Sequence, residues 1–256
     1  KDGEVNIVPW PVLGMYLPDA IAVYEAEGQL YLVTANEGDT RDYDGFSEEA
    51  RVEDLKLARR FLAHDSGIQA PEKLGRLKVT SSPPRGIHVR EDGTEVFREL
   101  FSFGGRSFSI WSAADARLVF DSGDQLESIT ARLLPDDFNS DNSENRSFDS
   151  RSDDKGPEPE GVAVGEVGGR TYAFICLERI GGVAVFDVTV PSSPSFVTYA
   201  SERDFNEDAE AGEAVDLGPE CVIFIAPDDS PSGEPLLVMA HEVSGSVTIY
   251  RIKPAR

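Results

Sequence analysis

The sequence predicts an all-β protein made of β-propeller blades, with a short helical insertion. Three observations support this fold class. Most of the chain consists of short β-type runs bounded by Gly, Pro and Asp, and a repeat that starts with Pro and an acid occurs three times. The runs from 160 to 200 also follow one another at about 8–12 residues, which is typical of a sequential antiparallel sheet. Repeated units of four antiparallel strands are the pattern of a propeller.

Each copy of the repeat begins with a proline and an acid, followed by a small residue and a β-branched residue. The copies start at Pro18, Pro159 and Pro219. After a hairpin, the second strand of each copy ends in another acid, 18 residues after the first acid in two copies and 22 in the third. The first acids of the three copies are Asp19, Glu160 and Glu220, and the second acids are Glu37, Glu178 and Glu242.

We interpret residues 1–256 as a single partial propeller domain built from these copies. We expect a first blade over 19–122, interrupted at 40–100, a second over 158–201, and an incomplete third over 218–252 that has three strands. Propellers close with about 4–8 blades, so we expect missing N-terminal blades or another chain to complete the ring. The chain starts at Lys1 without an initiator Met, which we interpret as a processed product or a fragment.

Within the first interruption, SEEARVEDLKLARRFLAHD (47–65) is predicted to be a helix. Ser47 is a suitable N-cap, and Val52, Leu55 and Leu62 would lie on one face.

A second insertion, 123–157, is rich in Asp, Asn and Ser and predicts a long ordered or metal-bound loop. It contains no EF-hand spacing, so its acids are expected to be solvated more often than to bind metal. Its candidate oxygen ligands are Asp141, Asn142, Glu144, Asp149, Asp153 and Asp154. Cys176 and Cys221 occupy small-residue positions of the repeat, which predicts two buried free thiols.

The composition limits the possible partners. The chain has 47 Asp and Glu against 24 Lys and Arg, a net charge of −23. This charge argues against nucleic acids and anionic membrane surfaces. It is compatible with divalent cations, and equally with a role in solubility or a saline habitat. No run approaches the ~20 apolar residues of a membrane span.

The repeated acids form the candidate site. Since equivalent positions of propeller blades converge on one axis, we expect Asp19, Glu37, Glu160, Glu178, Glu220 and Glu242 near one rim, where they would repel unless neutralised. The sequence leaves open two ways to neutralise these carboxylates. One is binding of Ca²⁺, which takes 6–8 oxygen ligands, and the other is pairing with arginines. The available arginines are Arg41, Arg106, Arg151 and Arg179.

Glu158 has no acidic counterpart at Leu17 or Gly218, so it is interpreted as a bystander or a local ligand.

Nucleophilic hydrolysis has little support, because the sequence lacks G-x-S-x-G, H-E-x-x-H and a P-loop. We therefore expect no organic cofactor. The three histidines share no spacing, and His241 is interpreted as a local polar contact. A metal-dependent phosphoesterase stays open, with Glu160, Arg106 and Arg179 as candidate catalytic residues around bound Ca²⁺.

Four long segments of the chain resemble a known family. They are WPVLGMYLPDAIAVYEAEGQLYLVTANEGDTRDYDGFSEEARVEDL, SFGGRSFSIW, FNSDNSENRSFDSRSDDKGPEPEGVAVGEVGGRTYAFICLERIGGVAVFDVTVPSSPSFV and LGPECVIFIAPDDSPSGEPLLVMAHEVSGSVTIYRI. These segments resemble the choice-of-anchor I family, also labelled mesenchyme-specific cell surface glycoprotein-like. The resemblance implies an extracellular, periplasmic or cell-surface propeller of seven blades, of which this chain matches the C-terminal half. Some relatives carry the label alkaline phosphatase, and the implied fold is similar to β-propeller phytases. One departure is SSPPRGIHVREDGTEVF, where the family has a more acidic stretch, and this weakens any metal site there.

Two functions therefore stay open. The first is a secreted or surface binding and assembly module stabilised by Ca²⁺. The second is a metal-dependent phosphoric monoester hydrolase acting on a phosphorylated or anionic small ligand. The first is favoured, because every clear motif explains architecture and none requires turnover.

Overall fold

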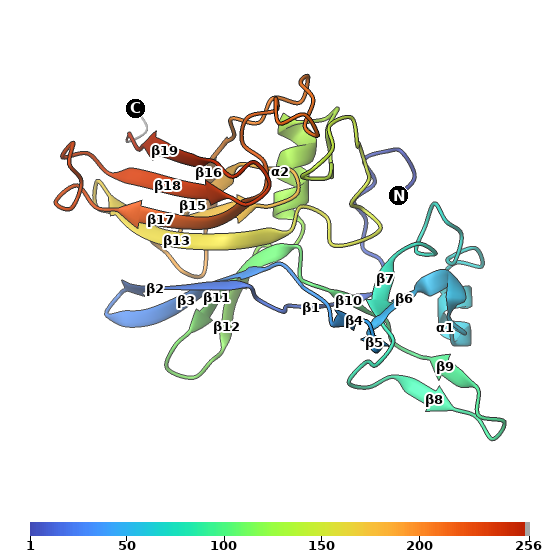
Figure 1. Cartoon of the computed structure of the whole chain (residues 1–256). Coiled ribbons are helices and arrows are strands. Elements are labelled where there is room, and N and C mark those ends of the chain that lie inside the picture. Colours follow the sequence, from blue (N-terminus) through green and yellow to red (C-terminus); the bar gives the residue numbers. More distant parts are fainter. Residues whose placement is uncertain (254–256) are drawn as a thin grey trace.

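The computed structural model describes residues 1–253 and is mostly β-sheet, with two short α-helices (Figure 1). Three consecutive antiparallel sheets form the larger part. The first sheet has the order β12-β11-β3-β2, the second β13-β14-β15-β16 and the third β17-β18-β19. Their strands are β2 (Ala20–Ala26), β3 (Gln29–Asn36), β11 (Ser107–Ser112), β12 (Leu118–Asp121), β13 (Pro159–Val167), β14 (Arg170–Leu177), β15 (Val183–Asp187), β16 (Ser195–Ala200), β17 (Pro219–Ile225), β18 (Leu236–His241) and β19 (Val247–Arg251).

The first strand of each copy of the repeat lies beside its counterpart in the next sheet. Strand β13 lies between β2 and β17 (Figure 1). The close approach depends on glycine, since a Cβ on Gly161 would lie 2.6 Å from the carbonyl oxygen of Glu220. Val162 packs toward the first sheet and Ala163 toward the third, so the two faces of β13 contribute to two hydrophobic cores.

The three sheets do not close on themselves within residues 1–253. The third sheet has three strands, as the incomplete last repeat predicted, and the far sides of the first and third sheets have no neighbouring sheet.

The insertion between β3 and β11 folds around its own core. Its strands β10, β7 and β6 form a sheet of order β1-β10-β7-β6 with β1, which comes before β2 in the chain and runs parallel to β10. The insertion also contains two hairpins, β4-β5 and β8-β9. The strands are β1 (Leu13–Met15), β4 (Asp42–Tyr43), β5 (Phe46–Ser47), β6 (Glu49–Arg51), β7 (Lys78–Thr80), β8 (Ile87–Val89), β9 (Glu95–Phe97) and β10 (Phe101–Phe103). The core of the insertion includes Val52, Phe61, Ile68 and Leu100.

The predicted helix over 47–65 is wrong in its first two thirds. Ser47 ends β5, and Glu49–Arg51 pairs with Lys78–Thr80 as strand β6. A 3₁₀ turn follows (Val52–Asp54), and only α1 (Arg59–His64) is α-helical. Pairing with a distant strand outweighs local helical periodicity here, because the strand brings Val52 into the core. Leu62 is exposed, and Phe61 is the residue that α1 buries.

The segment 123–157 is not simply a loop. It begins with α2 (Gln125–Leu133), which buries Leu126 and Ile129 against the first core. Polar side chains of the following loop make internal contacts, so Asp149 and Asp153 are buried rather than solvated as expected, whereas Glu144 is exposed. Asp149 accepts hydrogen bonds of 2.7 Å from the backbone amides of Asp2 and Gly3, and Asp153 pairs with Arg76 at 2.7 Å.

One of the two thiols differs from the prediction. Cys176 is fully buried, as expected, but Cys221 is exposed. Cys221 lies on the side of the third sheet that no other sheet covers, so its position in the repeat does not lead to burial. Neither α-helix among the described residues has the length and apolar character needed to cross a bilayer.

Candidate functional site

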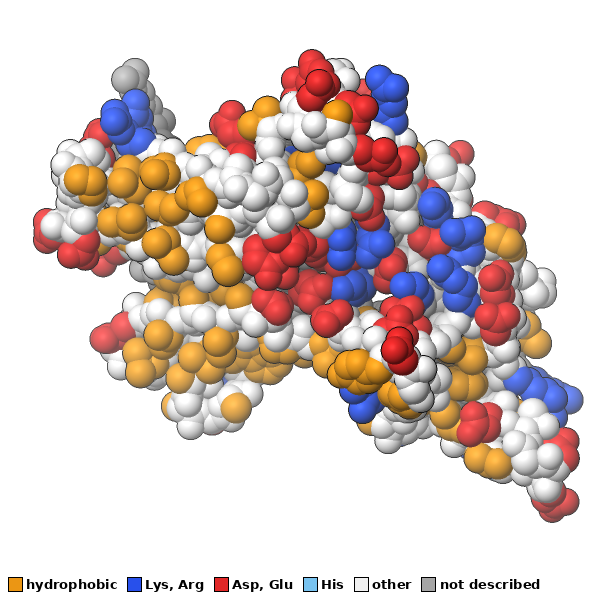
Figure 2. Space-filling model, in the orientation of Figure 1, with side chains coloured by type: hydrophobic (Ala, Val, Ile, Leu, Met, Phe, Trp, Pro, Cys, Tyr) orange, Lys and Arg blue, Asp and Glu red, His pale blue; other side chains and the backbone are white. Residues whose placement is uncertain are grey.

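The repeated acids are placed by an irregularity that recurs at the start of the inner strands. Strand pairing shifts register between Pro159 and Val162 in the second sheet, and between Pro219 and Cys221 in the third. Glu160 and Glu220 therefore lie in equivalent β-bulges, which turn side chains away from the regular alternation. Asp19 directly precedes the first paired residue of β2. Acidic side chains gather at this end of the inner strands, beside a group of Lys and Arg (Figure 2).

Each of these prolines follows a residue in the left-handed backbone region. The φ angles are 41° at Leu17, 50° at Glu158 and 67° at Gly218. The carbonyl of Glu158 accepts a hydrogen bond from the amide of Glu178 at 2.9 Å, and Gly218 accepts one from Glu242 at 2.8 Å. A left-handed conformation at a residue other than glycine costs energy, so surrounding contacts must hold Glu158 in place.

Those contacts make Glu158 the centre of an ion-pair cluster, and the interpretation of this residue as a bystander is wrong. Its side chain is fully buried and pairs with three bases. Lys155 Nζ lies 2.9 Å and Arg179 Nε 3.1 Å from Glu158 Oε2, and Arg151 donates to Glu158 Oε1. Burial raises the pKa of Glu158, but the positive charges of Lys155, Arg179 and Arg151 outweigh it and hold the pKa well below its ordinary value.

Two repeat acids belong to the same cluster. Glu37 pairs with Lys155, and Glu178 accepts a hydrogen bond of 2.6 Å from Asn142 and pairs with Arg179 at 3.1 Å. One carboxylate oxygen from each of Glu37, Glu158 and Glu178 lies within 4.8 Å of the others, as ligands of a metal ion would. The buried ammonium of Lys155 already pairs with two of these three carboxylates. We call Glu37, Glu158 and Glu178 the paired set.

Glu160 has a different environment. Its side chain is 8% exposed, and its Oε2 atom has no hydrogen-bond partner among residues 1–253. Burial raises the pKa of Glu160 far above its ordinary value, and the negative charges of Glu178, Glu220, Glu37 and Asp19 raise it further. Glu160 thus lacks the bases that the paired set has.

The remaining repeat acids are more accessible to solvent. Glu220 is partly buried, whereas Asp19 and Glu242 are exposed. None of these three makes an ion pair in the part of the chain that the structure describes. We call the first acids of the three copies, Asp19, Glu160 and Glu220, the open set.

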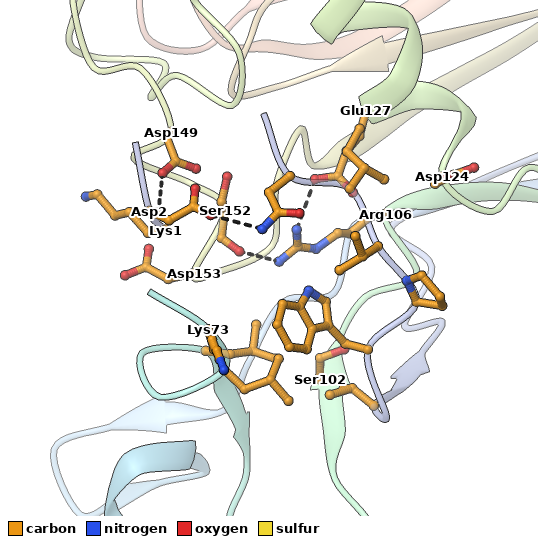
Figure 3. A pocket seen from close by; sticks show the side chains of 18 of the residues that line it. Lys1, Asp2, Lys73, Ser102, Arg106, Asp124, Glu127, Asp149, Ser152 and Asp153 are labelled. Atoms are coloured by element: carbon orange, nitrogen blue, oxygen red, sulfur yellow. Dashed lines mark hydrogen bonds and ion pairs between the residues drawn. The ribbon is translucent and has the colours of Figure 1, made fainter. Parts of the chain in front are cut away.

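Arg106 lies apart from the acids, in a cavity of about 480 Å³ between the N-terminal segment and the 149–153 loop (Figure 3). Its guanidinium pairs with Glu127 of α2 at 3.0 Å and donates to the carbonyl oxygens of Ser152 and Asp154 at 2.9 and 2.6 Å. Its donors thus join α2 to the loop. Arg41 is exposed and pairs with Glu48 rather than with a repeat acid.

His241, the last residue of β18 in the third sheet, is buried, with Nε2 3.5 Å from Asp216 Oδ2. Neither ring nitrogen has a hydrogen-bond partner among the described residues. Burial lowers the pKa of His241, and the charge of Asp216 opposes this only in part.

These features define a class of protein: a β-sheet repeat module whose successive units meet at a cluster of acids, part of it neutralised by internal bases. The chain belongs to the choice-of-anchor I domain family, whose model matches residues 1–191. The resemblance found in the sequence is thereby confirmed. The third sheet lies beyond the matched residues.

Two curated proteins are similar to the chain. One is Gigasin-3a of Magallana gigas, 31% identical over 196 residues that cover 73% of this chain and 67% of that protein. The other is the mesenchyme-specific cell surface glycoprotein of Strongylocentrotus purpuratus, 31% identical over 227 residues, covering 75% of this chain. The match spans only 28% of the sea urchin protein.

Sequence reasoning missed the roles of two buried members of the site, Glu158 and Lys155. Both lie just before the second repeat, in DDKGPEPEG, and neither has a counterpart in the other copies. The sequence signal that indicates them is the position of Lys155 shortly before Pro159, where the second copy of the repeat starts.

Proposed function

We propose that the chain is a secreted or cell-surface β-propeller module that binds and assembles through its sheets. The relatives' names, a choice-of-anchor domain and a cell surface glycoprotein, support the location. The proposal rests on a comparison of equivalent repeat positions: residues that are buried between neighbouring sheets have exposed counterparts on the uncovered faces of the first and third sheets.

The repeat makes this comparison direct. Val162 and Val222 face the preceding sheet and are 9% and 8% exposed, whereas the equivalent Ile21 of the first sheet is 63% exposed. On the opposite face, Ala163 is 8% exposed and the equivalent Ile223 of the third sheet is 57% exposed. Each of the three sheets thus carries apolar residues on both faces, including the faces of the first and third sheets that no other sheet covers.

The exposed faces are extensive. On the third sheet, strand pairing aligns Cys221 with Ala240 and Val247, and Ile223 with Val238 and Ile249. On the first sheet, Ile21 and Val23 are exposed along β2. Burying one such side chain stabilises an assembly by about 1.5–3 kcal/mol, and exposed apolar patches of this kind mark interaction sites. We propose further blades of the same kind, in this protein or in another chain, as the covering partner.

Sedimentation velocity tests the proposal with the purified chain. We expect concentration-dependent association, reduced by Ile223→Lys together with Ile249→Lys. Val197→Lys is the matched control, since Val197 is a similarly placed exposed residue on the outer strand β16 of the covered second sheet. A stable monomer of 27.9 kDa that the paired substitution leaves unchanged would contradict an assembly role.

We also propose that Ca²⁺ stabilises this module. Support comes from the acids that lack bases, since Ca²⁺ prefers carboxylate oxygens. Chelator should then lower the melting temperature, and an unchanged melting temperature would exclude calcium from the proposal.

The alternative is a phosphoesterase of the alkaline phosphatase or phytase type, using Glu160, Arg106 and Arg179. It has less support, because Arg106 and Arg179 already donate to protein groups. Hydrolysis of a chromogenic phosphomonoester, lost in Glu160→Ala and Arg106→Ala without loss of fold, would favour this alternative over the assembly module.

A further inference from the structure

The cavity that contains Arg106 is a second concave site, separate from the repeat acids. Its walls come from parts of the chain that are distant in sequence: the N-terminal segment, residues 72–77 of the insertion, residues 102–106, the start of α2 and the 149–153 loop. Its volume of about 480 Å³ is within the range of sites that hold small molecules, about 300–1,000 Å³. The side chains that line it therefore indicate which chemical group it fits.

The bases of the cavity have few donors left for an anionic ligand. The bases that line it are Lys1, Lys73 and Arg106. Arg106 pairs with Glu127 and donates to the carbonyl oxygen of Ser152 (Figure 3). Lys73 pairs with Asp65. An anion would have to displace these protein partners, so the cavity is poorly suited to phosphate or carboxylate groups.

Acids outnumber bases in the same lining by seven to three. They are Asp2, Glu4, Glu72, Asp124, Glu127, Asp149 and Asp153. Three of these, Glu4, Glu72 and Asp124, are exposed and make no ion pair within residues 1–253. The net charge of the chain, −23, adds a field of the same sign, which attracts cations to such a site.

The cavity also has an apolar part, which a bare metal ion would not use. Trp10, Leu74, Leu77 and Phe138 line it. Trp10 is partly exposed and packs against the core of the insertion, which fixes the position of its ring. The face of a tryptophan ring attracts a cation within about 6 Å, and apolar surface of this kind covers the hydrocarbon stem of a long basic side chain. The lining thus fits an organic cation with an apolar stem.

We propose that this cavity binds an alkyl ammonium group, with Trp10 against the stem and the carboxylates of Glu4, Glu72 and Asp124 attracting the charge. Free polyamines carry this group, and so does the lysine side chain of a partner protein. The inference goes beyond the proposed function, because no residue of the cavity lining belongs to the exposed faces of the first and third sheets.

NMR titration of ¹⁵N-labelled protein tests the site with its own reporter. The chain has two tryptophans, Trp10 in the lining and Trp111 outside it, and Trp10→Phe assigns their indole signals. The probes are hexane-1,6-diamine, hexane-1,6-diol and hexanedioate, which share a six-carbon chain and differ in charge. The diamine should shift the Trp10 signal at roughly millimolar concentration and leave Trp111 unchanged. The diol and the dianion should bind about tenfold more weakly or not at all. No shift with the diamine, or an equal shift with the diol, would overturn the proposal.

Charge-matched variants separate the cavity from the general acidity of the surface. Glu72→Gln with Asp124→Asn should weaken diamine binding about threefold or more, and both changes are at exposed residues, so the fold should be retained. Glu210→Gln with Glu213→Gln removes the same charge from two exposed acids outside the lining and should leave the affinity unchanged. Equal weakening in both double variants contradicts a specific site.

Trp10→Leu tests the aromatic wall without changing the charge. Isothermal titration should show diamine binding weakened by about two- to fivefold in this variant, provided that its melting curve shows a folded protein. Unchanged affinity would contradict the role of Trp10, whatever the acid variants show. Spermidine and the peptide acetyl-Gly-Lys-Gly-amide then distinguish the two sources of the group: tighter binding of spermidine supports a free polyamine, and tighter binding of the peptide supports a lysine of a partner. Binding of neither overturns the assignment.

Discussion

Replacing Lys155 by methionine tests whether the paired set is a structural latch. Methionine keeps the length of the buried apolar stem and removes only the ammonium group, which contacts both Glu37 and Glu158. Glu158 retains Arg151 and Arg179, whereas Glu37 makes no other ion pair among the described residues. The main consequence is therefore one unpaired buried carboxylate, at Glu37.

Breaking a buried pair by removing one partner costs about 3–5 kcal/mol. Because two of the three bases of the cluster remain, we expect the lower end, about 3 kcal/mol, or a fall in melting temperature of roughly 6–12 °C. Urea unfolding at pH 7 in EDTA measures this cost, with an unchanged m-value to show that the unfolded state is the same.

A second variant separates electrostatics from packing. Adding Glu37→Gln to Lys155→Met should restore much of the loss, because the acid left without its base is then neutral. Lys73→Met is the control, since Lys73 pairs with Asp65 at a partly exposed site and should change stability little. A loss below about 1 kcal/mol, or a double variant no more stable than Lys155→Met, would refute the latch.

Three further outcomes follow from the contacts. Gly161→Ala should lower stability by about 1–3 kcal/mol in thermal unfolding, because its Cβ would lie 2.6 Å from the Glu220 carbonyl; wild-type stability would contradict the close strand approach. Arg106→Met should cost about 1.5–3 kcal/mol by the same measurement, since it frees Glu127 and two carbonyls, and no loss would mean that α2 is held otherwise. Burial lowers the pKa of His241, so the unfolded state binds more protons than the folded state below about pH 6.5. The stabilisation that comes from neutral His241 is complete above this pH and declines as the pH falls through it. His241→Leu should remove this pH dependence of stability, and a dependence that persisted in the variant would count against the burial effect.

The repeat determined much of the fold in advance. The continuous apolar runs after the acids that follow Pro18, Pro159 and Pro219 are typical of a strand with two buried faces, because successive side chains of a β-strand point to opposite faces. The insertion was less predictable. Residues 49–51 have a helical pattern, but their pairing with 78–80 is a long-range contact that no local signal encodes.

The candidate site likewise contains residues that the repeat indicated and residues that only the structure revealed. Position in the repeat indicated six acids, because equivalent positions of equivalent strands are expected to come together; of these, Glu37 and Glu178 belong to the paired set. It could not reveal Lys155 or Glu158, which occur once and reach the cluster only because the 139–157 loop folds back over the strand ends. The sequence by itself therefore indicated that acids of successive repeats come together, such as Glu37 and Glu178. Only the tertiary structure decided which acids are neutralised, since Lys155 and Arg151 come from the segment before the second repeat, and neutralisation depends on distances of about 3 Å rather than on order along the chain.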